Sequence, residues 1–330
     1  MGVNSMRTSS TSMVRWVSGL LLCFVPMVCL YLSAWSSYAP FIYLGLLPAL
    51  VALERGMRVA AATAVVTPIS VFLGLVVSGS AWISAVFVAA ICVGVAWSYT
   101  KGWQGAATYI ASQGALAAIA APGARLTDSA PNSLASAAVV TGFVLVGGAW
   151  VVLMGILLLD DLPHKDHERP ADEDLRRFTI MLICLVFFGT LAAKLWLPGG
   201  HAWWVVLTIL VVLQPGIAGT SRRTFHRVLG TVAGGLVAAV LVNIIGINSV
   251  TTAIGVCVAV LSGIAYLKAP YWVFAALLTA ALMCLSFTPE TVMHGYAERA
   301  GFTLLAAAAT VLVLKVSDMA LRPVEKIENR

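Results

Sequence analysis

Long apolar runs, separated by short polar or Pro- and Gly-rich segments, recur along almost the whole chain. A membrane-spanning helix needs about 20 predominantly apolar residues, so this pattern predicts a series of transmembrane helices. One strongly polar stretch, residues 160–177, divides the runs into two sets of six. The predicted spans lie at 15–33, 38–53, 59–78, 82–98, 105–121, 137–159, 177–195, 203–215, 228–247, 251–267, 270–287 and 299–316.

The composition favours the same class of protein. Of the 330 residues, 60% are hydrophobic and 10% are charged, whereas a soluble domain carries about 25% charged residues. Twelve spans leave too little chain for a sizeable soluble domain, so nucleic-acid binding is not expected despite a net charge of +6. The six cysteines lie in apolar runs without metal-binding spacing, and phosphate-loop and hydrolase motifs are missing. We therefore expect no cofactor, no metal and no enzymatic activity.

The distribution of basic residues predicts the orientation. With the N-terminus placed inside, all Lys and Arg fall in inside loops and tails except Arg125, Lys194 and Arg299. Segments on the cytoplasmic side of membrane proteins are enriched in Lys and Arg. The pattern therefore predicts cytoplasmic N- and C-termini. The expected location is the plasma (inner) membrane of a bacterium.

An internal duplication is indicated when the chain is shifted by 169 residues, because Trp35 then falls on Trp204 and Arg58 on Arg227. Each half also carries an aromatic–Lys–aromatic segment, SYTKGW and AYLKAPYW. An even number of spans per half makes the two repeats parallel. The expected organisation is a first repeat at 1–159, a charged cytoplasmic linker at 160–176, a second repeat at 177–316 and a tail at 317–330.

Matched elements of two parallel repeats surround a common centre, and a ring of basic residues there would attract anions. Arg227 is the first candidate, since an Arg fork near a helix start binds carboxylates. Gln214 stands beside the Pro–Gly break that ends the eighth span. In the simpler interpretation, these basic residues only determine topology and Gln214 only marks a helix end. The candidates for the anion path are Arg55, Arg58, Lys101, Gln214, Arg223, Arg227 and Lys268.

Residues 201–241 combine a Trp-rich span, a Gln–Pro stop and a basic turn with an Arg-x-x-Gly-Thr-x-x-Gly motif at positions 227 to 234. This segment resembles the fusaric acid resistance (FUSC) family of membrane proteins. Arg299 also matches the pattern of that family and is a further candidate for the anion path. Gly230, Thr231 and Gly234 are expected to pack against another helix, because small residues one turn apart allow close approach.

The resemblance implies efflux of aromatic and other organic acids, and a distant relation to the aluminium-activated malate transporters, which are anion channels. We therefore expect export of organic carboxylate anions by a facilitator or secondary transporter. No Asp or Glu lies mid-span, which argues against a buried proton relay.

Three other functions stay open: an anion channel-like pore, a scaffold whose basic face binds anionic lipid or a partner, and a membrane-embedded lipid-modifying enzyme. The expected partners are the organic anion and membrane lipids. A homo-oligomer is also compatible with such a chain.

Overall fold

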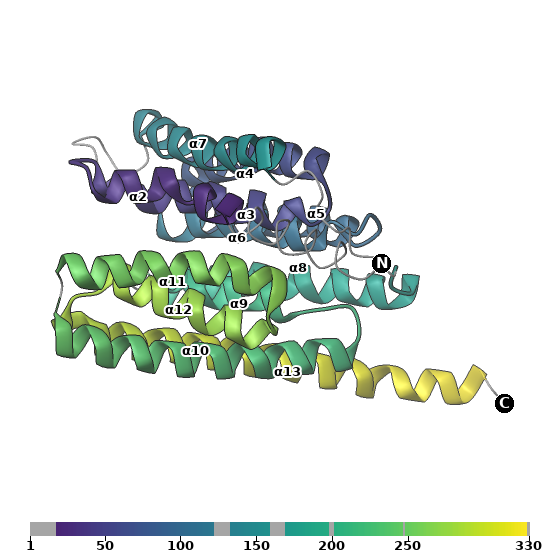
Figure 1. Cartoon of the computed structure of the whole chain (residues 1–330). Coiled ribbons are helices and arrows are strands. Elements are labelled where there is room, and N and C mark those ends of the chain that lie inside the picture. Colours follow the sequence, from purple (N-terminus) through teal and green to yellow (C-terminus); the bar gives the residue numbers. More distant parts are fainter. Residues whose placement is uncertain (1–17, 122–132, 159–168, 198–200, 247, 329–330) are drawn as a thin grey trace, which may run out of the picture.

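The computed structural model describes residues 18–121, 133–158, 169–197, 201–246 and 248–328, and the regular structure in these ranges is entirely helical (Figure 1). The all-α prediction is therefore confirmed for the described part of the chain. The helices are α2 (Val25–Tyr31), a short 3-10 helix η1 (Ser36–Tyr38), α3 (Ala39–Leu53), α4 (Met57–Val77), α5 (Ala81–Ser98), α6 (Gln104–Ala120), α7 (Leu134–Leu158), α8 (Asp172–Leu195), α9 (Trp203–Val212), α10 (Ile217–Ile245), α11 (Ser249–Lys268), α12 (Tyr271–Ser286) and α13 (Pro289–Glu328).

Eight helical segments in the described ranges are long and apolar enough to cross a membrane, so the chain is a polytopic membrane protein. The prediction of twelve full spans is not confirmed. Helix α9 has 10 residues and α12 has 16, which at 1.5 Å per residue gives about 15 and 24 Å. Both are shorter than the roughly 30 Å of a hydrocarbon core. Helix α9 is short because Pro215 and Gly216 follow it closely.

Several element ends differ from those predicted. Helix α13 begins at Pro289, ten residues before the predicted last span, and continues to Glu328 through most of the predicted tail. The predicted linker at 160–176 lies partly outside the described residues, and its last part belongs to α8. Three acidic residues open α8, where the positive end of the helix dipole favours them.

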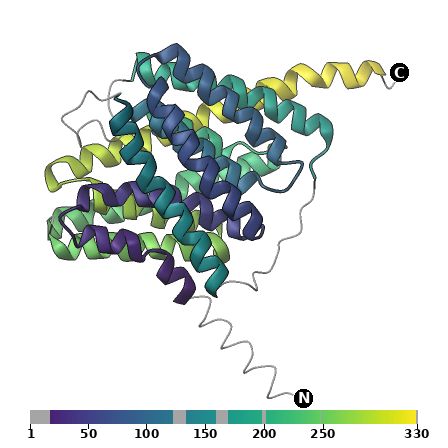
Figure 2. The same cartoon turned by 90° about the horizontal axis from the view of Figure 1, so that it is seen from above.

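The two halves of the chain form two groups of helices that lie one above the other in Figure 1, and α8 and α9 belong to the second group. In the first group α7 packs on α3 and α4, and α6 packs on α4. In the second group α13 packs on α9 and α10, and α12 packs on α10. The groups meet where α5 packs on α8 and α6 on α9. Beyond them, the C-terminal part of α13 projects away from the bundle (Figure 2).

Helices α10 and α12 approach each other closely along the small-residue face of α10. A Cβ atom added at Gly230 would lie 2.5 Å from the carbonyl oxygen of Trp272, and one added at Gly234 would lie 2.1 Å from that of Ala276. Only glycine permits this separation of the two backbones. Thr231, which sits between the two glycines, is buried.

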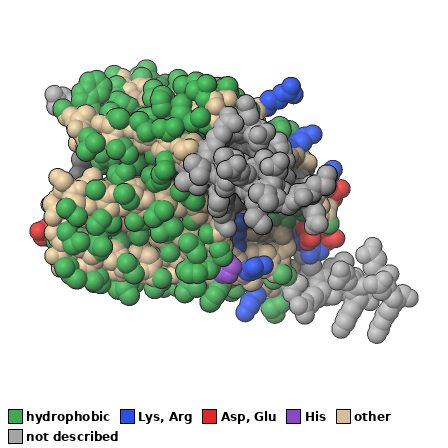
Figure 3. All heavy atoms as spheres, viewed as in Figure 1, with side chains coloured by type: hydrophobic (Ala, Val, Ile, Leu, Met, Phe, Trp, Pro, Cys, Tyr) green, Lys and Arg blue, Asp and Glu red, His purple; other side chains and the backbone are tan. Residues whose placement is uncertain are grey.

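Hydrophobic side chains cover the side of the bundle (Figure 3). Lys and Arg side chains gather toward the end from which α13 projects (Figure 3). This division is typical of a protein whose sides face lipid and whose ends face water.

Candidate anion-binding site

Two adjoining cavities of about 210 and 420 Å³ lie where the halves of the chain meet. Tyr99, Gln104, Gln214 and Arg223 line both cavities, and we call the two together the vestibule. It lies beside the turns that lead into α4, α6, α10 and α12, so four helix starts, with their positive dipole ends, surround it. The other charged and aromatic residues that line it are Glu54, Arg55, Tyr109, Arg222, His226, Tyr266 and Tyr271.

Arg223 is the one charged residue among the four that line both cavities. Its guanidinium carbon lies 4.3 Å from the ring centroid of Tyr271, a cation–π contact. Its Nε atom is buried and has no hydrogen-bond partner. Arg223 forms no ion pair with any described residue. The side chain is therefore held in place by an aromatic ring while a buried donor is left for a ligand.

The break between α9 and α10 positions Gln214 toward Tyr99. The backbone N–H of Gln214 donates to Oγ1 of Thr220 (2.9 Å), and that hydroxyl donates to the carbonyl of Gln214 (2.9 Å). Gly216, at φ 91°, then opens α10 in a conformation that other residues rarely adopt. The side-chain Oε1 of Gln214 accepts a hydrogen bond of 3.1 Å from Tyr99 Oη, which ties the two halves together across the vestibule.

Four tyrosines surround Arg223. Tyr109 and Tyr266 meet edge to face at 5.8 Å between ring centroids, and both contact Phe274. The hydroxyls of Tyr109 and Tyr271 are buried without a hydrogen-bond partner. Burial raises the pKa of Tyr99 to about 12, an effect that Arg223 and the bond to Gln214 only partly offset. Tyr99 is therefore a neutral hydroxyl at physiological pH.

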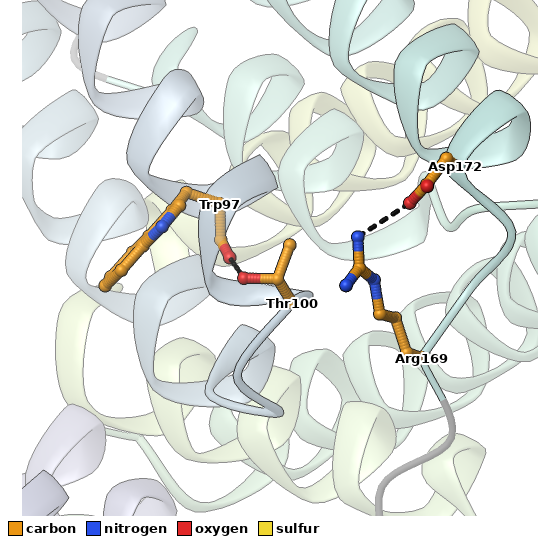
Figure 4. Close-up of polar contacts among 4 residues, drawn as sticks. All are labelled: Trp97, Thr100, Arg169 and Asp172. Carbon is orange, nitrogen blue, oxygen red and sulfur yellow. Dashed lines mark hydrogen bonds and ion pairs between the residues drawn. The ribbon is translucent and has the colours of Figure 1, made fainter.

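The charge of the vestibule is positive on balance. Arg55, Arg222 and Arg223 line it together with one carboxylate, that of Glu54. By contrast, Arg169 pairs with Asp172 at 2.7 Å at the start of α8 (Figure 4). The nearby contact of Thr100 with the Trp97 carbonyl (2.7 Å) closes the end of α5 (Figure 4). Arg169 is exposed and paired, and so is poorly suited to bind an anion.

Beyond the vestibule lie two further arginines with almost no solvent exposure. Arg227 is 2% exposed and stands one turn after Arg223 on α10, while Arg299 on α13 is 1% exposed. The Nε atoms of both arginines lack hydrogen-bond partners, as does Nη1 of Arg299. Neither arginine forms an ion pair with a described residue. Two positive side chains are therefore buried without a compensating carboxylate.

Trp204 supports the second of these arginines. The guanidinium carbon of Arg299 lies 4.6 Å from the Trp204 ring centroid, and its Nη2 donates weakly to Thr279 at 3.4 Å. His201 stacks on the same indole at 4.6 Å and bonds Glu298 through Nδ1 at 2.8 Å. Glu298 is thus engaged by His201 rather than by Arg299.

Not every predicted site residue lies at the vestibule or beside the buried arginines. Arg58 is exposed and lines a different, apolar hollow with Trp97 and Trp103, so the expectation that it faces the centre beside Arg227 does not match the structure. The reason is the position of each arginine relative to the start of its helix. Helix α4 begins one residue before Arg58, whereas α10 begins ten residues before Arg227 and so carries that residue into the packed interior.

The two predicted lysines add little to the vestibule. Lys101 is exposed and is not among the lining residues. Lys268 ends α11, and its side chain lies outside the described part of the structure.

The tyrosines and Gln104 were not predicted as site residues. A signal for them was present, because Tyr99 belongs to the segment SYTKGW and both Tyr266 and Tyr271 belong to AYLKAPYW. The prediction chose the lysines of these two segments because they are charged, and it left out the tyrosines beside them. Among the described residues, no group of three or more His, Cys, Asp or Glu could hold a metal ion.

The fold and the site together define a polytopic, all-helical membrane protein with a positively charged vestibule between its halves. Residues 180–313 match the family model described as fusaric acid resistance protein-like. This segment of the second half is therefore similar to that family, and the resemblance drawn from its sequence is confirmed. No curated protein and no solved structure matches the chain.

Proposed function

We propose that this protein carries organic carboxylate anions across the membrane and binds them first in the vestibule. The single observation behind the proposal is Arg223, which lines both cavities, lies on the ring of Tyr271 and has a buried Nε without a hydrogen-bond partner. A guanidinium binds a carboxylate through parallel N–H donors. The match to a fusaric acid resistance protein-like family supports transport of an organic acid.

The route onward follows the buried arginines. Arg227 lies one helical turn beyond Arg223, and Arg299 lies beyond it on the face of Trp204. Burying a charge without a partner costs several kcal/mol, and a passing anion relieves that cost. The two guanidiniums can therefore lower the barrier for a negative charge inside the bundle, where the apolar walls would otherwise exclude it.

The tyrosines favour an aromatic or other flat carboxylate. Tyr266 and Tyr271 line the vestibule, and Tyr109 adds a buried hydroxyl without a partner. Aromatic rings stack with aromatic ligands at about 0.5–1.5 kcal/mol per pair beyond area burial. The two cavities together have the size of a site for a small organic acid.

The orientation and the driving force belong to the same proposal. The basic end of the bundle faces the cytoplasm of a bacterium, since Lys and Arg favour that side. A potential of 100 mV, negative inside, then drives a monovalent anion outward with about 2.3 kcal/mol. The protein acts as an exporter of the facilitator or secondary-transporter type in the inner membrane.

The test is efflux of radiolabelled benzoate from proteoliposomes under an imposed potassium diffusion potential. Arg223→Gln and Arg227→Gln should each lower the efflux rate at sub-saturating benzoate by roughly ten- to a hundredfold, because a hydrogen bond to a charged group contributes about 1.5–3 kcal/mol. Arg176→Gln, an exposed arginine at the start of α8 that does not line the vestibule, is the matched control and should behave as the parent.

Two results would contradict the proposal. One is benzoate efflux that is equal in the parent and in both vestibule variants. The other is efflux that follows an imposed pH gradient and ignores the voltage. Acetate and a cation of similar size, measured in the same liposomes, separate aromatic preference from simple leakage.

A further inference from the structure

An apolar groove of about 530 Å³ runs between α4, α5 and α6 on the outer surface of the first half. Its lining includes exposed residues of α4, of α5 and of the turn before α6, among them Val66, Gly94 and Trp103, so the groove opens away from the centre. Among the described residues, Ala106 alone lines both the groove and the vestibule. Helix α6 is therefore the wall between two separate sites.

The groove has a polar end and an apolar end. Arg58, Trp97 and Trp103 line it near the turns at the basic end of the bundle, and Val66, Ala90 and Ile110 line it further along the same helices. Eight residues separate Arg58 from Val66, which is about 12 Å along α4. One leaflet of a membrane is about 15 Å of hydrocarbon, so the groove covers most of a leaflet.

The chemistry of the polar end is that of a membrane interface. Trp97 and Trp103 meet edge to face at 5.8 Å between ring centroids, and tryptophan is enriched at the level of lipid headgroups. Arg58 is exposed at this end, and Lys101 is exposed in the turn between α5 and α6. None of the described residues that line the groove is acidic.

We propose that the groove binds one anionic phospholipid of the surrounding bilayer, with its headgroup at Arg58 and an acyl chain lying along α4, α5 and α6. The charge and the tryptophans select the headgroup level, and the apolar lining takes the chain. The proposal does not depend on the proposed transport of anions, because the site faces lipid and lies on the other side of α6.

Gly94 offers a sharp test, since a Cβ atom added there would meet nothing within 4 Å. Gly94→Phe therefore fills the groove without disturbing its walls, and Gly94→Leu is a smaller version of the same change. Gly142 on α7 has equally open space but does not line the groove, so Gly142→Phe is the matched control. The melting temperature of each of these three variants in detergent should equal that of the parent or lie slightly above it, since glycine lowers helix stability.

The measurement is native mass spectrometry of the purified full chain with phosphatidylglycerol or phosphatidylcholine of identical acyl chains. The parent and Gly142→Phe should retain one phosphatidylglycerol that Gly94→Phe and Gly94→Leu lose. Arg58→Gln should reduce the preference for phosphatidylglycerol over phosphatidylcholine about fivefold, the effect of one basic residue at an anionic surface.

Equal retention of phosphatidylglycerol by Gly94→Phe and the parent would overturn the proposal. Displacement of the lipid by benzoate at its transport concentrations would also overturn it, because the groove would then belong to the transported anion. Loss of benzoate efflux in Arg223→Gln has no bearing on this result, so the two proposals can fail separately.

Discussion

Arg299 lies with its guanidinium carbon 4.6 Å from the centroid of the Trp204 ring, and both side chains are buried. The aromatic face takes the place of an acidic partner, because cation–π contacts stabilise a desolvated guanidinium by about 2 kcal/mol. The pair joins α9 to α13 while leaving Nε and Nη1 of Arg299 without hydrogen bonds. Arg299 is therefore buried with two of its nitrogen atoms unbonded and with an aromatic ring in place of a carboxylate.

Replacing Arg299 by Met should therefore separate stability from transport. The variant removes a buried charge that has no ion-pair partner and keeps similar volume, so the free energy of unfolding should be unchanged or rise by about 1–4 kcal/mol. Benzoate efflux should fall at least tenfold. Arg299→Lys, which keeps the charge, is the comparison. A Met variant that transports as well as the parent would remove Arg299 from the path.

Removing the Tyr109 hydroxyl should alter ligand binding without altering the fold. That hydroxyl is buried and has no partner, so Tyr109→Phe loses no internal hydrogen bond and its melting temperature should match the parent. If the hydroxyl donates to the bound carboxylate, the KM for benzoate should rise about two- to tenfold. Tyr31→Phe, outside the vestibule, is the control, and an unchanged KM in both variants would exclude this role for Tyr109.

Gly234 and Gly301 should respond in opposite directions to substitution by Ala. A Cβ at position 234 would lie 2.1 Å from the carbonyl oxygen of Ala276, whereas one at position 301 would meet nothing within 4 Å. Gly234→Ala should cost about 1–3 kcal/mol through overpacking between α10 and α12. Gly301→Ala should gain up to about 1 kcal/mol of helix stability. Thermal unfolding in detergent measures both, and equal melting temperatures would argue against the close approach.

The raised pKa of Tyr99 predicts a loss of stability in alkali. Its pKa is about 12 in the folded chain, chiefly because of burial, against about 10 for an exposed tyrosine. Its contribution is thus complete below pH 10 and is lost as the pH rises from 10 to 12, by up to roughly 2 to 3 kcal/mol. Tyr99→Phe should show a shallower fall in melting temperature between pH 9 and 11 than the parent. Identical slopes would mean that Tyr99 titrates as an exposed tyrosine.

Local pattern was enough to predict most of the helices. The predicted span 82–98 corresponds to α5 at Ala81–Ser98, and the predicted span 105–121 to α6 at Gln104–Ala120. The ends differ most at α13, where Glu290, His294 and Glu298 broke the apolar run that was used to mark a span. Glu298 binds His294 one turn away on the same helix and His201, which is far away in the sequence.

The sequence by itself determined the helical membrane character of the chain and the family resemblance of its second half, since each depends on residue type and local order. Only the tertiary structure decided which basic residues face the centre. Helix α10 carries Arg227 into the interior, whereas Arg58 stands in the first turn of α4 and faces an outer groove. The direction of a side chain depends on where its helix begins and what packs against it, and neither is determined by the spacing of charges along the chain.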